Sequence, residues 1–315
     1  HQVHNDLPIS FSLNNEALTL TKQTNTRLSN QELVVFSDLP IANLLALQSF
    51  CHIDINTLTA INTRNQQTSY RFNISCDDFM TARKSLADFA LAQGIEAALI
   101  KDAPILNEPG LLVMDMDSTT IEIECIDEIA KLAGVGEQVA AVTELAMQGE
   151  LDFAQSLHQR VATLSNAPET ILADVAKNIP LMAGLETLIT ELKKHNWRIA
   201  VASGGFTYFA DHLKDLLNLD ATFANVLEIS DGKLTGKVLG SVVDAQVKAD
   251  SLTLLTKQYE IPARQTVAMG DGANDLVMMA AASFGVAFHA KPIVLAQADS
   301  AINQQGLDCL LHWLA

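Results

Sequence analysis

The chain has few cysteines, no long apolar run and no segment typical of an export signal. Its four cysteines, Cys51, Cys76, Cys125 and Cys309, form no C-x-x-C pair and have no zinc-like spacing. We therefore expect reduced, packed thiols in a cytoplasmic protein. No apolar run reaches the roughly 18 residues of a membrane span, which argues against a membrane partner. The first four residues lack the basic and apolar regions of a secretory signal.

Basic residues are also scarce. Lys and Arg number 20 against 37 Asp and Glu, so the formal net charge is −17. This balance argues against nucleic acid as a partner, because nucleic-acid binding requires a basic face. An anionic substrate would be repelled at long range, so a phosphate site here must carry local positive charge. Hydrophobic residues make up 49% of the chain and charged residues 18%, which argues against a disordered chain. The length of 315 residues allows two domains or one domain with a large insertion.

The first part of the chain, residues 1–106, is predicted to form a small α+β domain. Its periodicity indicates strands at 33–36, 52–62, 68–75 and 95–100, with helices at 41–50 and from Asp77 or Asp78 to Gln93. This β-α-β-β-α-β order is that of a ferredoxin-like module, and it resembles the ACT-type domains attached to amino-acid enzymes. Two roles stay open for it. It could be a packing or dimerisation module, which would make the chain a homodimer, or it could be a ligand sensor.

The second domain, residues 107–315, is predicted to be a Rossmann-type α/β domain. The turn-forming segment 107–110 marks the boundary, and an apolar strand follows at 111–114. After residue 184, strands alternate with helices, which indicates an open parallel sheet covered on both faces. Residues 122–182 are helical in pattern and contain no clear strand. They are therefore predicted to form a helical cap inserted after the first strand.

Polar motifs follow three of the predicted parallel strands. Ligands of open α/β sheets bind beyond the carboxyl ends of the strands, so these motifs should converge on one crevice. The first two carboxylates, Asp115 and Asp117, would repel each other unless a cation bound there. Oxygen ligands of this kind suit Mg²⁺, and Asp271 can supply a third one. The motifs are Asp115-Met116-Asp117-Ser118-Thr119, Ser203-Gly204-Gly205 and Gly270-Asp271-Gly272-Ala273-Asn274-Asp275, with Lys248 near the start of a later helix.

Each of these residues also has a purely structural interpretation. Ser203 could cap the following helix, and Asn274 could cap the next one. Lys248 alone would usually be a solvated surface lysine. Asp275 could be a favourable acid in a first helical turn. The combination on three strand ends in series favours the functional interpretation.

The combined motifs resemble those of the haloacid dehalogenase (HAD) superfamily of phosphohydrolases, over about residues 111–290. Within it, the resemblance is closest to the phosphoserine phosphatase family, on the basis of Glu124, Phe153 and Arg160 in the cap. The resemblance implies a Mg²⁺-dependent phosphatase that acts in the last step of serine biosynthesis. It also implies a covalent aspartyl-phosphate on Asp115, with Asp117 as general acid and then general base.

The resemblance assigns a role to each remaining residue. Ser203, Gly204 and Gly205, placed at a helix N-terminus, would hold phosphate oxygens, and Lys248 would neutralise the transferring phosphoryl group. Asp115, Asp271 and the backbone carbonyl of Asp117 would hold Mg²⁺. Asn274 would position the phosphate, and Asp275 would orient Lys248 or the metal's surroundings. In the cap, Glu124 would bind the ammonium of phosphoserine, Arg160 its carboxylate, and Phe153 would pack on its side chain.

Two other functions remain as alternatives. A HAD phosphatase or phosphotransferase for another small phosphomonoester would keep Asp115 and Asp117 without needing the pair Glu124 and Arg160. A non-catalytic amino-acid sensor would use a relic phosphate site as a ligand pocket. The carboxylate of Asp117 argues against the sensor, because binding alone does not require an acid there.

Overall fold

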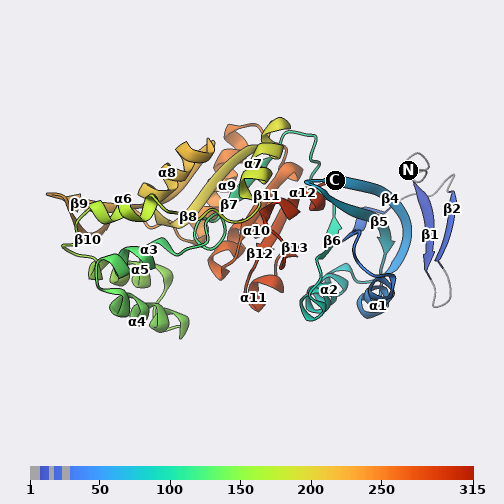
Figure 1. Cartoon of the computed structure of the whole chain (residues 1–315), viewed down its shortest axis with the longest axis horizontal. Helices are drawn as coiled ribbons and strands as arrows, with labels where there is room; N and C mark the ends of the chain where they lie inside the picture. The colour runs from blue at the N-terminus through green and yellow to red at the C-terminus, as the bar shows by residue number, and fades with distance from the viewer. Residues whose placement is uncertain (1–7, 14–17, 23–28) are drawn as a thin grey trace.

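Two sheets divide the molecule into an N-terminal domain and a larger C-terminal domain. The computed structural model describes residues 8–13, 18–22 and 29–315. The two domains lie side by side along the long axis, and a helical cap projects from the larger domain on the side away from the N-terminal domain (Figure 1). Within the described part of the chain, none of the helices has the length and apolar character needed to cross a membrane.

The N-terminal domain is an antiparallel sheet of six strands in the order β2-β1-β4-β5-β3-β6. Its predicted β-α-β-β-α-β succession is confirmed from β3 to β6, and the order of those four strands is that of a ferredoxin-like module. Strands β1 and β2 extend the sheet beyond β4, in a segment whose sequence shows little periodicity. The elements are β1 (Ile9–Leu13), β2 (Leu18–Lys22), β3 (Gln31–Phe36), α1 (Ile41–Cys51), β4 (Asp54–Arg64), β5 (Gln67–Ser75), α2 (Phe79–Gln93) and β6 (Ala97–Lys101).

Helix α2 begins and ends where the sequence predicts. The carboxylate of Asp78 accepts the backbone N–H groups of Met80 and Thr81, each at 3.1 Å. Gly94 ends the helix in the left-handed conformation at φ +61°, which costs glycine little because it has no Cβ. The apolar face of the helix, including Leu86, packs on the sheet. The cap residue, the apolar face and the terminal glycine together account for the helix.

Strand β3 is apolar throughout its second half because both faces of the sheet are buried there. Leu33 and Val35 belong to the core under α1 and α2. Val34 and Phe36 belong instead to the core of the larger domain. Phe36 lies 5.8 Å from Trp313, measured between ring centroids, so the extreme C-terminus of the chain packs on the N-terminal sheet.

The larger domain contains a seven-stranded sheet in the order β10-β9-β8-β7-β11-β12-β13. All its neighbouring strands are parallel except the hairpin of β9 and β10, as predicted. The elements β13, α11 and α12 near the C-terminus were not predicted. The elements are β7 (Leu111–Met114), α7 (Leu185–Lys194), β8 (Arg198–Phe206), α8 (Thr207–Leu217), β9 (Ala221–Ser230), β10 (Lys233–Leu239), α9 (Ala245–Gln258), β11 (Thr266–Gly270), α10 (Leu276–Ala281), β12 (Phe284–Phe288), α11 (Pro292–Leu295), β13 (Ser300–Ile302) and α12 (Leu310–Trp313).

The cap follows β7, as the helical pattern predicts, and consists of α3 (Cys125–Leu132), α4 (Gly136–Met147), α5 (Phe153–Thr163) and α6 (Thr170–Ala176). Its entering and leaving segments run side by side. The N–H of Glu122 donates to the carbonyl of Pro180, and that of Met182 donates to the carbonyl of Thr120, each at 3.0 Å. These two connections place the cap helices over the carboxyl end of β7.

Arg71 ties the C-terminus to the N-terminal sheet. It is only 4% exposed, forms an ion pair with Glu32, and donates to the carbonyls of His312, Trp313 and Leu314. Removing the guanidinium would leave a half-buried carboxylate and buried carbonyl oxygens without their donor. Such groups are costly because they have lost water without gaining a replacement partner.

We therefore expect Arg71→Met to lower the free energy of unfolding by about 3–5 kcal/mol. Urea denaturation followed by circular dichroism measures the change. Arg264→Met is the matched control, because Arg264 pairs with Glu108 but its side chain is 58% exposed, and it should change stability by less than about 1 kcal/mol. Equal effects of the two substitutions would contradict this role of Arg71.

Candidate active site

Three neighbouring parallel strands deliver the predicted polar motifs to one edge of the sheet. Strands β8, β7 and β11 are adjacent, and they end close to Ser203, Asp115 and Asp271 respectively. The strands themselves are apolar because they are buried between the two helical layers. The first polar residues therefore appear where each strand leaves the core, as the sequence predicts.

A cavity of about 310 Å³ lies between these strand ends and the cap helices α3 and α5. Ten of the twelve predicted site residues line it: Asp115, Asp117, Glu124, Phe153, Arg160, Ser203, Gly204, Gly205, Asp271 and Asn274. The other two, Lys248 and Asp275, lie beneath it. Lys248 contacts Asp115 directly, and Asp275 contacts Lys248. The structure thus brings every predicted residue to one place, while their individual roles stay predictions.

Lys248 is a buried cation held between two carboxylates. Its Nζ lies 2.9 Å from Oδ1 of Asp115 and 2.8 Å from Oδ1 of Asp275, and the residue is 1% exposed. Burial by itself would lower the pKa of Lys248, but the two carboxylates outweigh it and raise the pKa above its usual value. Lys248 is therefore charged at neutral pH and is not the solvated surface lysine of the structural interpretation.

Asp115 presents its two oxygens differently. Oδ1 accepts the ammonium of Lys248 and also the backbone N–H of Met116, at 2.7 Å. Oδ2 has no hydrogen-bond partner among the described residues. The carboxylate is held in place through one oxygen, which leaves the other available to a ligand in the cavity.

Carboxylate oxygens of Asp115, Asp271 and Asp275 all lie within 4.8 Å of one another. Burial, and then the charge of Asp115, raise the pKa values of both Asp271 and Asp275. A set of buried oxygen donors whose charges repel one another fits a divalent cation, which would relieve that repulsion. The predicted set contained Asp115, Asp271 and Asp117 through its backbone carbonyl. In the structure, the third carboxylate of this cluster belongs to Asp275 and not to Asp117.

The carboxylate of Asp117 points to the cap side of the cavity. Its Oδ1 accepts the backbone N–H of Cys125, the first residue of α3, at 3.3 Å. Burial, followed by the nearby carboxylates of Glu124 and Asp115, raises its pKa to about 8. Asp117 can therefore hold a proton at neutral pH, which a general acid requires.

The segment Ser203-Gly204-Gly205 lies in the last residues of β8, directly before α8. The sequence predicts a start of this helix at Phe206, and the helix begins at Thr207 without a side-chain cap. The hydroxyl of Ser203 instead accepts the N–H of Gly205 at 2.8 Å, so Ser203 is not a helix cap. A Cβ on Gly204 would lie 2.4 Å from the ring of Phe153. Only glycine allows that ring to approach the strand end so closely.

The cap contributes one carboxylate, one guanidinium and one aromatic ring to the cavity. Glu124 precedes α3 and accepts the hydroxyl of Ser118 at 2.7 Å. Phe153 starts α5, because Asp152 and Gln155 form a capping box just before it. Arg160 lies in the last turn of α5, and its buried Nε has no partner among the described residues. Glu124 and Arg160 thus both line the cavity without forming an ion pair with each other.

Two residues at the site were missed by sequence reasoning. Lys291 lines the cavity from the loop after β12. Its position after a parallel strand could have identified it, as it did Ser203. The hydroxyl of Thr119 donates to Asp271 at 3.3 Å and links the first and third motifs. Thr119 is the last residue of the D-x-D-x-T pattern, so its role follows from spacing already visible in the sequence.

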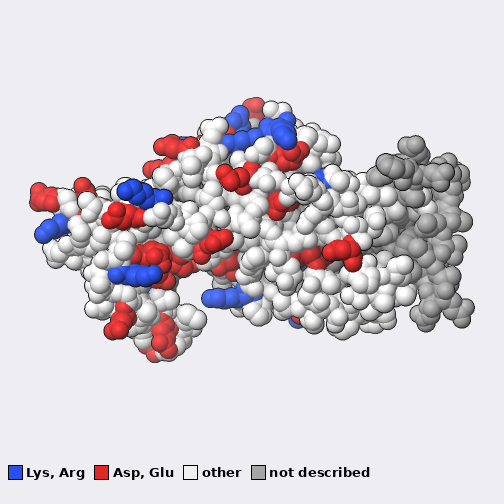
Figure 2. Space-filling view, viewed as in Figure 1, with Lys and Arg blue, Asp and Glu red and all other residues white. Residues whose placement is uncertain are grey.

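Acidic side chains gather around the junction between the cap and the larger domain on the face shown in Figure 2. The local positive charge that an anionic substrate needs comes from Arg160 and Lys291 at the cavity and Lys248 beneath it. The site is therefore a small group of cations in an acidic surrounding, as the net charge of −17 requires.

Comparisons with known proteins agree with this geometry. Residues 110–283 match the haloacid dehalogenase-like hydrolase family. The chain belongs to the haloacid dehalogenase-like hydrolases, which confirms the superfamily predicted from the motifs.

Three relatives illustrate the similarity. A phosphoserine phosphatase of Vibrio cholerae is 61% identical over 213 residues, which cover 68% of this chain and 65% of that protein. A phosphoserine phosphatase of Haemophilus influenzae is 59% identical over 221 residues, covering 70% of each. The crystal structure of a probable phosphoserine phosphatase from Vibrio cholerae, in unliganded form, superposes with a TM-score of 0.75 at 46% identity, covering 92% of this chain and 88% of that one. The aligned segment thus spans slightly less than two thirds of the first relative.

The raised pKa of Asp117 predicts how stability depends on pH when no metal is bound. An unfolded Asp ionises near pH 4, whereas Asp117 ionises near pH 8 in the folded chain. Between these values the folded chain holds a proton that the unfolded chain has lost, so stability falls as pH rises. Asp117→Asn stays neutral and should reduce this fall. At pH 8.5 it should be more stable than the parent chain by up to about 5 kcal/mol, because each unit of pKa difference is worth about 1.4 kcal/mol.

Thermal unfolding in EDTA at pH 5.5, 7 and 8.5 measures this effect. The matched control is Asp250→Asn, on the exposed face of α9, which should follow the parent chain at every pH. If Asp117→Asn lost stability with rising pH as steeply as the parent chain, the protonation of Asp117 would be refuted.

Proposed function

We propose that this chain is a Mg²⁺-dependent phosphoserine phosphatase of the cytoplasm. It would hydrolyse O-phospho-L-serine to L-serine and phosphate, the last step of serine biosynthesis. The observation that carries the proposal is the placement of Glu124 and Arg160 in one cavity with Asp115. The names of the relatives in Vibrio cholerae and Haemophilus influenzae point to the same substrate.

The first step forms a covalent intermediate on Asp115. Its free oxygen, Oδ2, attacks phosphorus while the bond from phosphorus to the serine oxygen breaks. Asp117 gives its proton to that serine oxygen, so L-serine leaves as a neutral alcohol. The hydrogen bonds from Lys248 and Met116 to Oδ1 keep the attacking carboxylate from rotating away.

The second step returns the enzyme to its starting state. Asp117, now ionised, takes a proton from a water molecule as that water attacks the phosphorus of the aspartyl-phosphate. The bond from phosphorus to Asp115 breaks, and inorganic phosphate is released. Asp117 then carries the proton it needs for the next turnover.

The strand ends hold the phosphoryl group during both steps. Ser203, the N–H of Gly204 and the amide of Asn274 would donate to its oxygens, while the N–H of Gly205 donates to the hydroxyl of Ser203 and orients it. Lys248 adds positive charge from beneath. When bound to Asp115, Asp271 and the carbonyl of Asp117 or the carboxylate of Asp275, Mg²⁺ would neutralise charge on the phosphoryl oxygens.

The cap selects the amino-acid part of the substrate. Glu124 can accept the ammonium, and Arg160 can donate to the carboxylate. The ring of Phe153, seated on Gly204, excludes water from the short side chain between them. Because both charges are required, a phosphoester with only one of them would leave a charged cap residue without a partner.

Asp115→Asn is expected to abolish phosphate release from L-phosphoserine, because an amide cannot form the acyl phosphate. The parent chain should release phosphate with MgCl₂ and lose this activity in excess EDTA. A colorimetric phosphate assay measures both, and circular dichroism checks that the variant folds. Asp250→Asn should retain full activity. Metal-independent turnover, or an active Asp115→Asn chain, would refute the mechanism.

Arg160→Ala is expected to raise KM for L-phosphoserine about 10- to 100-fold, which corresponds to losing a hydrogen bond to a charged group. Turnover of p-nitrophenyl phosphate, which has no carboxylate, should change less than about threefold. Lys131→Ala is the matched control, because Lys131 is a cap cation whose side chain is 75% exposed.

The comparison also separates the alternative substrates. If Arg160→Ala impaired both substrates equally, the role of Arg160 as carboxylate clamp would be wrong. If sugar phosphates were turned over as efficiently as L-phosphoserine, the chain would be a HAD phosphatase of another specificity.

A further inference from the structure

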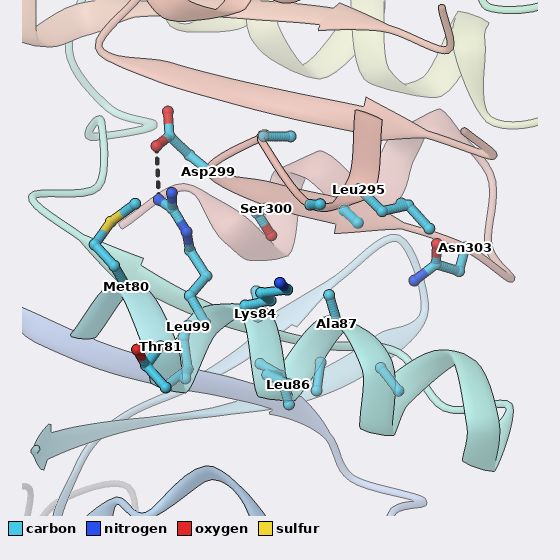
Figure 3. A pocket seen from close by; sticks show the side chains of 17 residues that line it. Met80, Thr81, Lys84, Leu86, Ala87, Leu99, Leu295, Asp299, Ser300 and Asn303 are labelled. Carbon is cyan, nitrogen blue, oxygen red and sulfur yellow. Dashed lines mark hydrogen bonds and ion pairs between the residues drawn. The ribbon is translucent and has the colours of Figure 1, made fainter. Parts of the chain in front are cut away.

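A second cavity, of about 270 Å³, lies between the two domains and away from the candidate active site. Helix α2 and strand β6 form its N-terminal wall, and α11 with the start of β13 forms the opposite wall (Figure 3). Most of its lining is small and aliphatic. Its aliphatic lining includes Leu86, Ala87, Leu99, Leu295 and Ala298.

Among the polar groups that line this cavity, Ser300 and Lys84 have no side-chain partner among the described residues. Ser300 is 8% exposed, and its buried hydroxyl makes no hydrogen bond. In Figure 3 that hydroxyl points across the cavity toward α2. Lys84 extends from α2 into the space below Ser300, and it takes part in none of the ion pairs of the described chain. A buried hydroxyl without a partner is uncommon in a folded protein and calls for a ligand or water.

The other charged groups in the cavity already have partners. Arg83 forms an ion pair with Asp299 at 2.7 Å. Asp299 also accepts the N–H of Gly285 at 2.8 Å. The charge that remains for a ligand is therefore that of Lys84, and it is positive.

Two sets of contacts between the domains hold the walls of the cavity in place. The pair of Arg83 and Asp299 crosses from α2 to the segment before β13. The carboxylate of Glu96, next to β6, accepts the N–H groups of Asn303, Gln304 and Gln305. The cavity is present while both sets of contacts are formed. It is therefore preformed, as small-molecule sites usually are.

We propose that this cavity is a regulatory site for a small aliphatic carboxylate. The carboxylate end would pair with Lys84 and accept the hydroxyl of Ser300, while a short branched tail would pack on the alanines and leucines. A free monocarboxylic acid and a neutral α-amino acid share this chemistry. The site is distinct from the phosphoserine site proposed above, since no residue lines both cavities.

The segment 291–301 connects the two sites. It starts at Lys291, which lines the active-site cavity, and continues through α11 to Ser300 in the second cavity. Strand β13 is also paired with β12, with Val286 opposite Ser300 and Phe288 opposite Ile302. A ligand packed against Leu295 and Ser300 would shift the position or mobility of Lys291. Binding there should therefore change how the active site holds its anionic substrate.

Binding to the full chain is tested by isothermal titration calorimetry with three matched probes. L-valine and 3-methylbutanoate carry the carboxylate and the branched tail, with and without an amino group. L-valinol has the tail and the amino group but no carboxylate. We expect at least one of the two carboxylates to bind at millimolar concentration or below, and L-valinol to bind at least about tenfold more weakly.

Variants locate the binding. Lys84→Met keeps the aliphatic stem without the charge and should weaken binding about tenfold or more. Ser300→Ala should weaken it severalfold without lowering the melting temperature, because its hydroxyl has no partner to lose. The control is Lys101→Met, an exposed lysine on β6 outside the cavity, which should bind as the parent chain does. Failure of both carboxylates to bind at 20 mM, or full binding by Lys84→Met, would overturn the site.

The regulatory effect has its own readout. With the bound carboxylate present, KM for a phosphoester substrate should change at least about threefold in the parent chain and remain unchanged in Lys84→Met. p-Nitrophenyl phosphate serves as substrate, so the result does not depend on phosphoserine being the natural one. Binding without any change in KM or kcat would overturn the regulatory role, and the calorimetry would be unaffected if the proposed reaction itself were wrong.

Discussion

The candidate active site depends on one buried cation. Lys248 contacts both Asp115 and Asp275 where the strand ends bring several carboxylates together. Without it, these acids would raise one another's pKa until one of them held a proton. Buried ion pairs contribute little net stability, because desolvation cancels most of their attraction. The benefit of Lys248 is therefore positional: it fixes Oδ1 of Asp115 and leaves Oδ2 available to a ligand in the cavity.

The sequence predicted the strand-end residues because their placement depends on topology alone. In a parallel sheet every carboxyl end meets the same edge, so the order of apolar strands and polar motifs is sufficient. Asp115, Ser203 and Asp271 required no knowledge of side-chain packing. Helix α2 was predictable for a similar reason, since Asp78 and Gly94 act on their own backbone neighbours. Local hydrogen bonds and sheet topology are the parts of this fold that a sequence expresses directly.

What the sequence did not reveal depends on contacts between distant segments. Strand β13 has three residues and exists because it pairs with β12. Arg71 carries no local pattern, yet its partners are carbonyls more than 240 residues away. Ser203 was open to interpretation as a helix cap, but β8 continues past it through pairing with β9, where Phe206 lies opposite Asn225. In each case the deciding interaction comes from tertiary packing, which overrides the local sequence preference.

The acidic composition is compatible with the proposed anionic substrate because selectivity would operate at short range. Charges farther apart than about 8 Å are largely screened at physiological ionic strength, so the net charge matters less than the groups in the cavity. In the proposed function, Glu124 would also act by excluding the wrong substrates. Ser118 is the one hydrogen-bond partner of its carboxylate among the described residues, so a phosphoester without an ammonium would bury this carboxylate further without a new partner. Discrimination would then come from an unfavourable contact with the wrong substrate as much as from a favourable one with the proposed substrate, phosphoserine.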